Sequence, residues 1–291
     1  KARPVIILHY TIKPNIYGTI AASLVCIRVI INVFGLGTVF LDKNLASRVA
    51  IYLYRFAFRF PKKIFFQNKD DMTLFRRKKI VKEKVCEVLP GSGINLNEFQ
   101  PVAKSVNGNF TFLLISRLIY DKGVVEFIEA VKKLKEKGVD AKFQILGAID
   151  EKHRRGIPKE VIDGWLKEGW VEYLGTTHDV RNSIANSDCV VLPSYREGTP
   201  RTLLEAASMS KPLIATNVPG CNNVVIDNYN GFLCRLRDSQ DLADKMERLF
   251  NLPAEKLAEF GENSRKEVEK YKLPIPCPVG RYAASSFTLD E

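Results

Sequence analysis

The feature that most constrains the fold is a regular alternation of short apolar runs with amphipathic stretches from Asn109 onward. The apolar runs are expected to be strands: 110–116, 141–147, 171–175, 188–194, 212–216 and 231–235. The amphipathic stretches are expected to be helices: 123–137, 178–187, 199–210, 222–227 and 240–250. Apolar strands that each lead into a helix are typical of a parallel sheet covered on both faces. We therefore expect a doubly wound α/β domain.

The first hundred residues show a shorter version of the same alternation. Strands are expected at 4–10, 28–33, 63–68 and 84–90. Helices are expected near 16–25, 44–60 and 70–79. Four strands are few for a Rossmann-like domain, so we expect this amino-terminal domain to be incomplete.

Composition indicates where the domains divide. Residues 90–109 are rich in Gly, Asn and Pro and are expected to be an interdomain linker. From Leu273 onward the chain is proline-rich and has no hydrophobic period. We therefore expect a partial domain over 1–100, a second Rossmann-like domain over 101–272 and an irregular tail over 273–291.

The charge balance narrows the range of partners. The chain has 44 Lys and Arg against 33 Asp and Glu, a net charge of +11 that attracts phosphate groups, nucleic acid or an anionic membrane. Eleven of these cations lie between Arg55 and Lys84, against three acids. This basic run has no nucleic-acid recognition motif and falls on predicted core elements, so we expect no nucleic-acid partner.

The cysteines, the histidines and the longest apolar stretch exclude other classes. Six cysteines form no Cys-x-x-Cys pair and three histidines are scattered, so no metal site is expected, and reduced thiols suit a cytoplasmic protein. The stretch 18–41 has the length of a membrane span, but Arg28 near its middle would cost about 2.5–3.5 kcal/mol. A helix, a turn, a strand and a glycine loop explain this stretch better.

In open parallel sheets, ligands bind beyond the carboxyl ends of the strands, and the most informative loop follows the strand expected at 188–194. Thr199 is expected to cap the next helix, with Pro200 in its first position, where a missing N–H costs nothing. The free N–H groups of that turn and the positive end of the helix dipole would form an anion site. Gly198 would let a ligand approach closely.

Two carboxylates, Glu197 and Glu205, flank this anion site. A carboxylate accepts two hydrogen bonds, which suits the vicinal hydroxyls of a ribose or a hexose. The alternative is a solvent-facing loop glutamate and an ordinary helix glutamate. Glu205 lies between Leu204 and Ala206 in a stretch with few polar neighbours, which is unfavourable for full solvation.

A second polar loop follows the strand expected at 110–116. Ser116 and Arg117 stand at the strand end, and Lys122 stands just before the next helix. A guanidinium fork and a mobile ammonium suit a diphosphate, although such a pair could also be two solvated cations. A third loop begins at Gly175 and could line a nucleotide base or merely cap the next helix through Thr177. We favour capping for its side chains.

Together these motifs resemble glycosyltransferase family 4, whose members are retaining enzymes with the GT-B fold of two Rossmann-like domains. The resemblance covers about residues 4–270 and rests on four motifs in the family's order: Glu-x7-Glu (197 and 205), SRLIYDKG (116–123), YLGTTHDV (173–180) and KPLIATNVPG (211–220). HYTIKPNIYG, FGLGTVF and VLPGSGINLNEF further resemble a bacterial subgroup. Its members add N-acetylhexosamine or related sugars to polyprenyl-diphosphate-linked acceptors in surface polysaccharide assembly.

The resemblance implies a role for each motif. Arg117 and Lys122 would hold the diphosphate of a UDP-sugar donor, and Glu197 would contact the donor sugar, which makes these three the candidate catalytic residues. Glu205 would bind the ribose diol. The remaining candidates for donor binding are Ser116, Gly175, Gly198, Thr199, Pro200, Arg201, Thr202, Gly35 and Gly37. The implied mechanism is front-face attack by the acceptor hydroxyl, with the leaving phosphate assisting its deprotonation.

Three departures or absences bear on this expectation. No Asp-x-Asp occurs, so a metal-clamped diphosphate is unsupported and no cofactor is expected. Many relatives carry a histidine where this chain has Phe34, so any acid–base role there passes to the following glycines or to the substrate. The family's glycine-rich first loop is also missing, so we expect donor binding but poor turnover.

The expected partners are a UDP-sugar and a polyprenyl-linked glycan acceptor. The helix expected at 45–60 places Arg48, Arg55 and Arg59 along one stripe among apolar residues. This helix could rest on anionic lipid at the inner face of the cytoplasmic membrane, or it could pack on the sheet, which we favour. The remaining functional alternatives are a nucleotide-sugar epimerase of the same architecture and a catalytically silent donor-binding protein.

Overall fold

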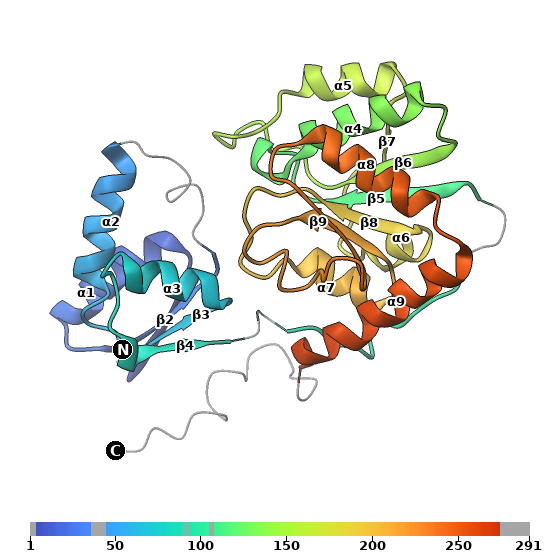
Figure 1. Ribbon diagram of the computed structural model, residues 1–291. Coiled ribbons are helices and arrows are strands. Elements are labelled where there is room, and N and C mark those ends of the chain that lie inside the picture. Colours follow the sequence, from blue (N-terminus) through green and yellow to red (C-terminus); the bar gives the residue numbers. More distant parts are fainter. Residues whose placement is uncertain (1–3, 36–44, 90, 92, 105–107, 274–291) are drawn as a thin grey trace.

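The computed structural model describes residues 4–35, 45–89, 91, 93–104 and 108–273. This part of the chain forms two units, each a parallel sheet flanked by helices (Figure 1). The expected α/β class with two parallel sheets is confirmed. Gly37 lies outside the described residues, and so does the tail beyond Leu273.

The first unit contains four parallel strands in the order β1-β2-β3-β4. These strands are β1 (Ile6–Tyr10), β2 (Arg28–Val33), β3 (Lys63–Phe66) and β4 (Cys86–Val88). Its helices are α1 (Thr19–Leu24), which continues a π-helical turn (Pro14–Gly18), α2 (Leu45–Ala57) and α3 (Lys69–Arg77), followed by a 3₁₀ turn (Glu83–Val85). All four strands expected from the sequence are therefore present.

An aromatic cluster holds α2 and α3 on this sheet. Tyr54 of α2 and Phe75 of α3 make an edge-to-face contact with ring centroids 5.5 Å apart. Phe58 packs against both rings, and Phe66 of β3 lies 5.2 Å from Phe75. All four side chains are buried. Such pairs add about 0.5–1.5 kcal/mol each beyond their buried area, so this cluster anchors both helices.

The second unit contains six parallel strands in the order β10-β9-β8-β5-β6-β7. These strands are β5 (Phe110–Ile115), β6 (Ala141–Leu146), β7 (Glu172–Tyr173), β8 (Cys189–Leu192), β9 (Leu213–Thr216) and β10 (Gly231–Cys234). Its helices are α4 (Val124–Glu136), α5 (Lys159–Lys167), α6 (Arg181–Ala185), α7 (Arg201–Ser208), α8 (Ser239–Phe250) and α9 (Ala254–Val268). The chain first builds outward from β5 and then from β8, so a topological switch point lies between these two strands.

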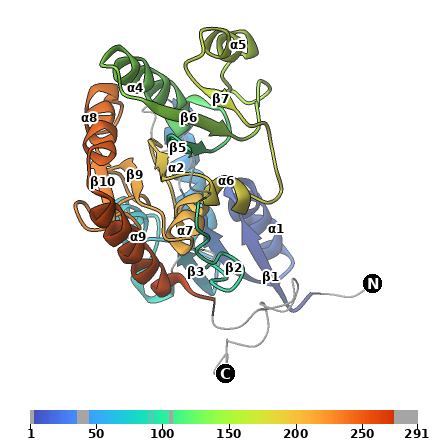
Figure 2. The same ribbon diagram turned by 90° about the vertical axis from the view of Figure 1, so that its right-hand side faces the viewer.

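The alternation of side chains along β5 explains why residues 112–115 are all apolar. Phe112 and Leu114 point to the core beneath α4 and α8, whereas Leu113 and Ile115 point to the core beneath α6 and α7. Figure 2 shows these helices on opposite sides of the sheet. Where a strand is buried on both faces, apolar side chains are favoured at successive positions.

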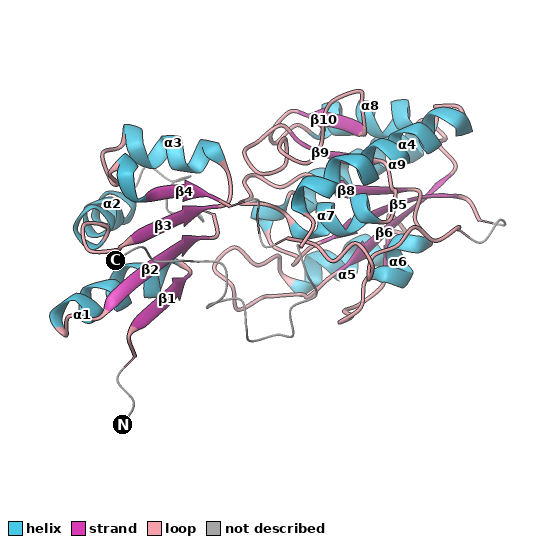
Figure 3. Cartoon of the chain, turned by 90° about the horizontal axis from the view of Figure 1, so that it is seen from below, coloured by secondary structure: helices cyan, strands magenta, loops and turns pink. Residues whose placement is uncertain are grey.

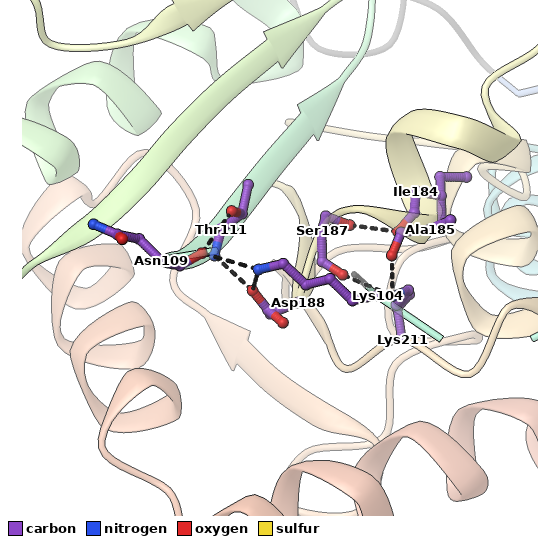
Figure 4. Close-up of polar contacts among 8 residues, drawn as sticks. All are labelled: Lys104, Asn109, Thr111, Ile184, Ala185, Ser187, Asp188 and Lys211. Atoms are coloured by element: carbon purple, nitrogen blue, oxygen red, sulfur yellow. Dashed lines mark hydrogen bonds and ion pairs between the residues drawn. The ribbon is translucent and has the colours of Figure 1, made fainter. Parts of the chain in front are cut away.

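A polar network joins the amino-terminal ends of the central strands of the same sheet (Figure 4). The carboxylate of Asp188 accepts the backbone N–H of Thr111 at 2.7 Å and pairs with Lys104. Nearby, Lys211 is 8% exposed and donates to the carbonyls of Ala185 and Ser187 at 2.8 and 2.7 Å. Burial lowers the pKa of Lys211. This network lies at the end of the sheet away from the loops predicted to bind a ligand.

Residues 94–99, within the expected linker, pack into the second unit. Ile94, Leu96 and Phe99 belong to its core. The backbone of Ile94 accepts from Leu273 and donates to Tyr271, both near 3 Å. This segment therefore lies against the carboxyl-terminal end of α9 and its following turn.

One expected helix is absent from the structure, and two helices of the structure were not expected. The helix expected at 222–227 is wrong, because this segment forms turns. The side chain of Asn230 accepts from Ile226 N and donates to Val224 O, which stabilises a non-helical path. Helices α5 and α9 were not anticipated, because α5 contains Gly164 and α9 is strongly charged. In the described part of the chain, every helix is too short or too polar to span a bilayer.

Candidate functional site

The loops that follow β5 and β8 meet at the switch point, because these two strands are neighbours in the sheet. Lys122 from the first loop forms an ion pair with Glu197 from the second. Both side chains are largely buried, at 23% and 13% exposed. The backbone of Tyr195 donates to Asp121 at 2.9 Å, which joins the two loops directly. The structure therefore brings together two of the three predicted catalytic residues.

Gly123 allows this close approach of the two loops. Its φ is +69°, and a Cβ at this position would lie 2.0 Å from the carbonyl oxygen of Pro193. A larger residue would push the loops apart, so the glycine that follows Lys122 is required by geometry.

Arg117 occupies a more exposed part of the same edge. Its side chain is 54% exposed and lies 3.4 Å from Asp150, which follows β6. Ser116 and Gly175 are linked to this edge through Gly147: a Cβ on Gly147 would collide with Ser116 O, and its N–H donates to Gly175 O at 2.8 Å. The loops after β5, β6 and β7 therefore lie side by side, with Arg117 among them but directed toward Asp150.

Helix α7 begins one position later than predicted. Its N-cap position is Pro200, without a side-chain cap, so the expected capping by Thr199 is wrong. The hydroxyl of Thr199 instead donates to the backbone oxygen of Gln67 at 3.2 Å, because this tertiary partner outcompetes the local cap. Thr202 in the first turn donates to Ile115 O at 3.3 Å, which places the start of α7 at the end of β5. Thr177 likewise does not cap α6, whose N-cap position is Val180.

Glu205 is a buried carboxylate on α7. It is 7% exposed and accepts from Arg201 Nε at 2.7 Å, one helical turn away. Burial raises the pKa of Glu205, the contact with Arg201 opposes this shift, and the charges of Glu98 and Asp179 reinforce it. A carboxyl group whose pKa is perturbed by desolvation, on the helix that follows a central strand, is a candidate for ligand binding.

The first unit closes over this loop from the other side. The carboxyl edges of the two sheets face each other, with the loops between them (Figure 3). Gly35, which follows β2, has φ +105°, and a Cβ there would lie 3.4 Å from Gly198 N. A Cβ on Gly198 would lie 2.5 Å from Gln67 Oε1 and 3.0 Å from Phe34 O. The predicted glycines therefore provide the close contact between the units.

Three site-forming residues were missed from the sequence: Gln67, Asn68 and Asp71. Gln67 and Asn68 follow β3, and both contact the 198–199 backbone. Asp71 pairs with Arg196. The expectation of a strand over 63–68 assigned Gln67 and Asn68 to the sheet, although polar residues at a strand end are themselves a signal for a site. Among the described residues, no group of three or more His, Cys, Asp or Glu side chains could hold a metal ion.

Known structures define the class to which this architecture belongs. The chain superposes on Anabaena HepE in complex with UDP-glucose with a TM-score of 0.79 at 21% identity, over 92% of this chain and 75% of that one. It superposes on sucrose-phosphate synthase from Thermosynechococcus elongatus with a TM-score of 0.80 at 19% identity, over 92% and 69%. Two open parallel sheets with facing carboxyl edges are thus the GT-B fold expected above.

The sequence defines the family. A family model described as "Glycosyl transferases group 1" matches residues 97–267, more than half of the chain. The chain belongs to this family, and the expectation of a glycosyltransferase is confirmed.

Named relatives agree with this assignment. The chain is 30% identical over 277 residues to the N,N'-diacetylbacillosaminyl-diphospho-undecaprenol alpha-1,3-N-acetylgalactosaminyltransferase of Campylobacter jejuni, covering 89% of this chain and 71% of the relative. It is 29% identical over 202 residues to the capsular polysaccharide biosynthesis glycosyltransferase CapM of Staphylococcus aureus, covering 65% and 52%. It is 26% identical over 261 residues to an Escherichia coli UDP-Gal:alpha-D-GlcNAc-diphosphoundecaprenol alpha-1,3-galactosyltransferase, covering 84% and 66%. The chain thus spans from 52% to 71% of the length of these relatives.

Proposed function

We propose that this chain carries the donor site of a retaining transferase that moves a hexose or N-acetylhexosamine from a UDP-sugar to a lipid-linked saccharide. The observation that carries the proposal is the Lys122–Glu197 pair at the switch point, with the buried Glu205 on the adjoining helix. The names of the Campylobacter and Escherichia relatives support the acceptor class, since both refer to undecaprenol-diphosphate-linked sugars.

Each side chain has a task in the proposed reaction. Lys122 and Arg117 neutralise the charge that develops on the departing diphosphate, and the amino end of α7 adds its dipole. Glu197 orients the donor sugar while its ion pair with Lys122 fixes both groups in advance. Glu205 accepts hydrogen bonds from the ribose diol. The acceptor hydroxyl attacks from the same face as the leaving phosphate, which takes its proton.

The proposed donor site does not need a metal ion for charge compensation. In the proposed reaction two cations and a helix terminus offset the charge of the diphosphate, and one preorganised contact of this kind is commonly worth about 10²–10³-fold in rate. We therefore expect transfer to continue in EDTA.

A nucleotide-sugar screen tests the proposal. A UDP-sugar that binds only the folded state stabilises it by RT ln(1 + [L]/Kd), so the melting temperature rises with the logarithm of ligand concentration above Kd. We expect UDP and one UDP-hexose to stabilise the protein, ADP and GDP to do so less, and Arg117→Ala and Glu205→Ala to weaken UDP binding with the fold intact. Unchanged affinity in both variants would refute the placement of the site.

Product analysis then separates transfer from its alternatives. Incubation with donor alone should leave the sugar configuration unchanged, whereas an epimerase would convert it. Addition of a polyprenyl-diphosphate-linked saccharide should yield an α-linked product. Donor binding without product on any such acceptor would support a silent binding protein instead.

We also propose that α2 docks the chain on an anionic membrane, at the inner face of the cytoplasmic membrane. Support comes from a stripe of large apolar side chains on α2 and just beyond it, exposed by 44% to 67%: Val49, Tyr52, Phe56 and Phe60. The opposite face of α2 packs on the sheet as favoured above, through Tyr54 and Phe58. One helix thus offers an apolar stripe to a lipid interface while its other face holds the fold.

Cations beside the stripe suit lipid phosphates. A cavity of about 340 Å³ between α2 and the end of α3 is lined by five of them: Arg55, Arg59, Arg76, Lys79 and Lys82. We expect the protein to pellet with phosphatidylcholine vesicles that contain phosphatidylglycerol, less so in high salt, and less for Tyr52→Ser/Phe56→Ser. Val161→Ser, an exposed apolar residue on α5, is the matched control. Failure to pellet at low ionic strength would end the docking proposal.

A further inference from the structure

We infer that Asp71, with Gln67 and Asn68, is a positioning unit that lets the first unit set the conformation of the Glu197 loop in the second. This inference rests on the proposed function, because it assigns the loop to the sugar end of the donor. In this view the second unit alone binds the nucleotide, and contact between the units completes the part of the site that holds the sugar.

The centre of the positioning unit is an ion pair between the two units. Arg196 Nη2 contacts Asp71 Oδ1, and the side chains are 18% and 0% exposed. Asn68 caps the first turn of α3: its Oδ1 accepts from Asp71 N at 2.7 Å, and its Nδ2 lies 3.3 Å from Asp71 Oδ2. The carboxylate that meets Arg196 is therefore fixed by its own helix before the units come together.

Hydrogen bonds to the backbone extend this contact along the loop. Asn68 Nδ2 donates to Gly198 O at 2.9 Å. Thr199 N donates to Gln67 Oε1 at 3.1 Å, and the Thr199 hydroxyl donates to Gln67 O. Residues on both sides of Glu197 are thus held by the first unit, while Glu197 itself reaches back to Lys122 in the second.

The second unit holds the rest of the site without this help. Glu205 and Arg201 lie on α7, and Lys122 lies on the loop after β5. Its own contacts to the loop include the Lys122–Glu197 ion pair and the bonds of Tyr195 N to Asp121 O and of Glu197 N to Pro219 O at 3.3 Å. The contacts described above between the first unit and the loop therefore fall on residues 196–199, at one end of the site, whereas Glu205 lies at the other.

The ion pair is poorly suited to a purely stabilising role. Burial raises the pKa of Asp71 even though Arg196 opposes the shift. Arg196 Nε is buried without a hydrogen-bond partner. Buried ion pairs of this kind commonly stabilise a fold no better than apolar residues of the same volume. What the pair supplies is a defined geometry for the residue next to Glu197.

The test compares Asp71→Asn with wild type in three measurements: Kd for UDP, and kcat and KM for sugar transfer. Asparagine keeps the shape and removes the charge. We expect kcat to fall about 10- to 100-fold, since a displacement of about 1 Å in a reacting group can cost this much. We expect Kd for UDP to stay at the wild-type value. Asp70→Asn, an exposed neighbour on the same turn, is the matched control and should leave all three values unchanged.

A double-mutant cycle with Arg196→Gln sharpens the result. If Asp71 acts through Arg196, the double variant should be no slower than the slower single variant. Arg196→Lys, which keeps the positive charge, should have a higher kcat than Arg196→Gln. A parallel loss of melting temperature and UDP affinity in Asp71→Asn would show a structural role and overturn the inference, as would an unchanged kcat. A wild-type protein that fails to bind UDP would instead refute the proposed function.

Discussion

Replacement of Glu205 by glutamine should weaken UDP binding without loss of stability. The side chain is 10% exposed, and Arg201 Nε occupies one of its oxygens at 2.7 Å. Burial raises the pKa of Glu205, which means that the fold destabilises its ionised form. Removal of this charge should therefore leave the melting temperature unchanged or raise it. If Glu205 had a purely structural role instead, the same substitution would lower the melting temperature.

The magnitude of the binding loss follows from the proposed contacts. The ribose diol would donate hydrogen bonds to a carboxylate, and each hydrogen bond to a charged group contributes about 1.5–3 kcal/mol. Glutamine keeps one acceptor oxygen and loses about one such bond. The Kd for UDP should then rise roughly 10- to 150-fold.

Isothermal titration calorimetry with UDP measures this change directly. Glu98→Gln is the matched control, because Glu98 is exposed and its charge acts on Glu205 through space. It should leave the Kd unchanged or slightly lower it. If Glu205→Gln binds UDP as tightly as wild type, or if it unfolds more easily, the assignment of Glu205 to the ribose is wrong.

The raised pKa also fixes the sign of the pH dependence. The contribution of Glu205 to stability is present below its ordinary pKa of 4.5 and is lost as pH rises through the higher folded-state pKa. The stability advantage of the glutamine variant should therefore widen as pH rises from 4.5. UDP affinity should run the opposite way and weaken at acid pH in wild type. The variant corrects for titration of the UDP phosphate, whose own pKa lies near 6.

Three further variants test other contacts. Gly123→Ala should lower the free energy of unfolding by more than the roughly 1–2 kcal/mol of a positive φ, because its Cβ would meet Pro193 O. Gly138→Ala, also at positive φ but in open space, gives the backbone cost alone; equal losses in urea titrations would contradict the clash. Lys211→Met should destabilise by about 2–5 kcal/mol, because two buried carbonyls lose their donor, and should leave UDP affinity intact. Lys122→Met should slow single-turnover sugar transfer by about 10²–10³-fold, and a wild-type rate would remove Lys122 from the mechanism.

The second unit could be predicted from the sequence because its signals are local. Each apolar run forms a strand, and the order of strands and helices indicates a doubly wound sheet. The proximity of Lys122 and Glu197 follows from the same logic, since each lies in the loop that follows a strand. Two residues at the carboxyl ends of neighbouring parallel strands must lie near each other.

The contacts between the units could not be predicted in this way. Gln67, Asn68 and Asp71 act on a loop far along the chain, since Asn68 and Gly198 are separated by 130 positions in the sequence. Hydrophobic periodicity contains no information about such a contact. The same contact explains the misplaced start of α7, since Thr199 has the side chain of a helix cap but donates to Gln67 instead.

The attachment of residues 94–99 to the second unit has a mechanical consequence. The polypeptide between Val88 and Ile94 contains only five residues, 89–93, so this connection can extend by no more than about 3.3–3.6 Å for each of them. The two halves cannot drift far apart along this connection. Any large motion of one unit relative to the other must therefore be mainly a rotation about this short tether, with the greatest travel at the points farthest from it.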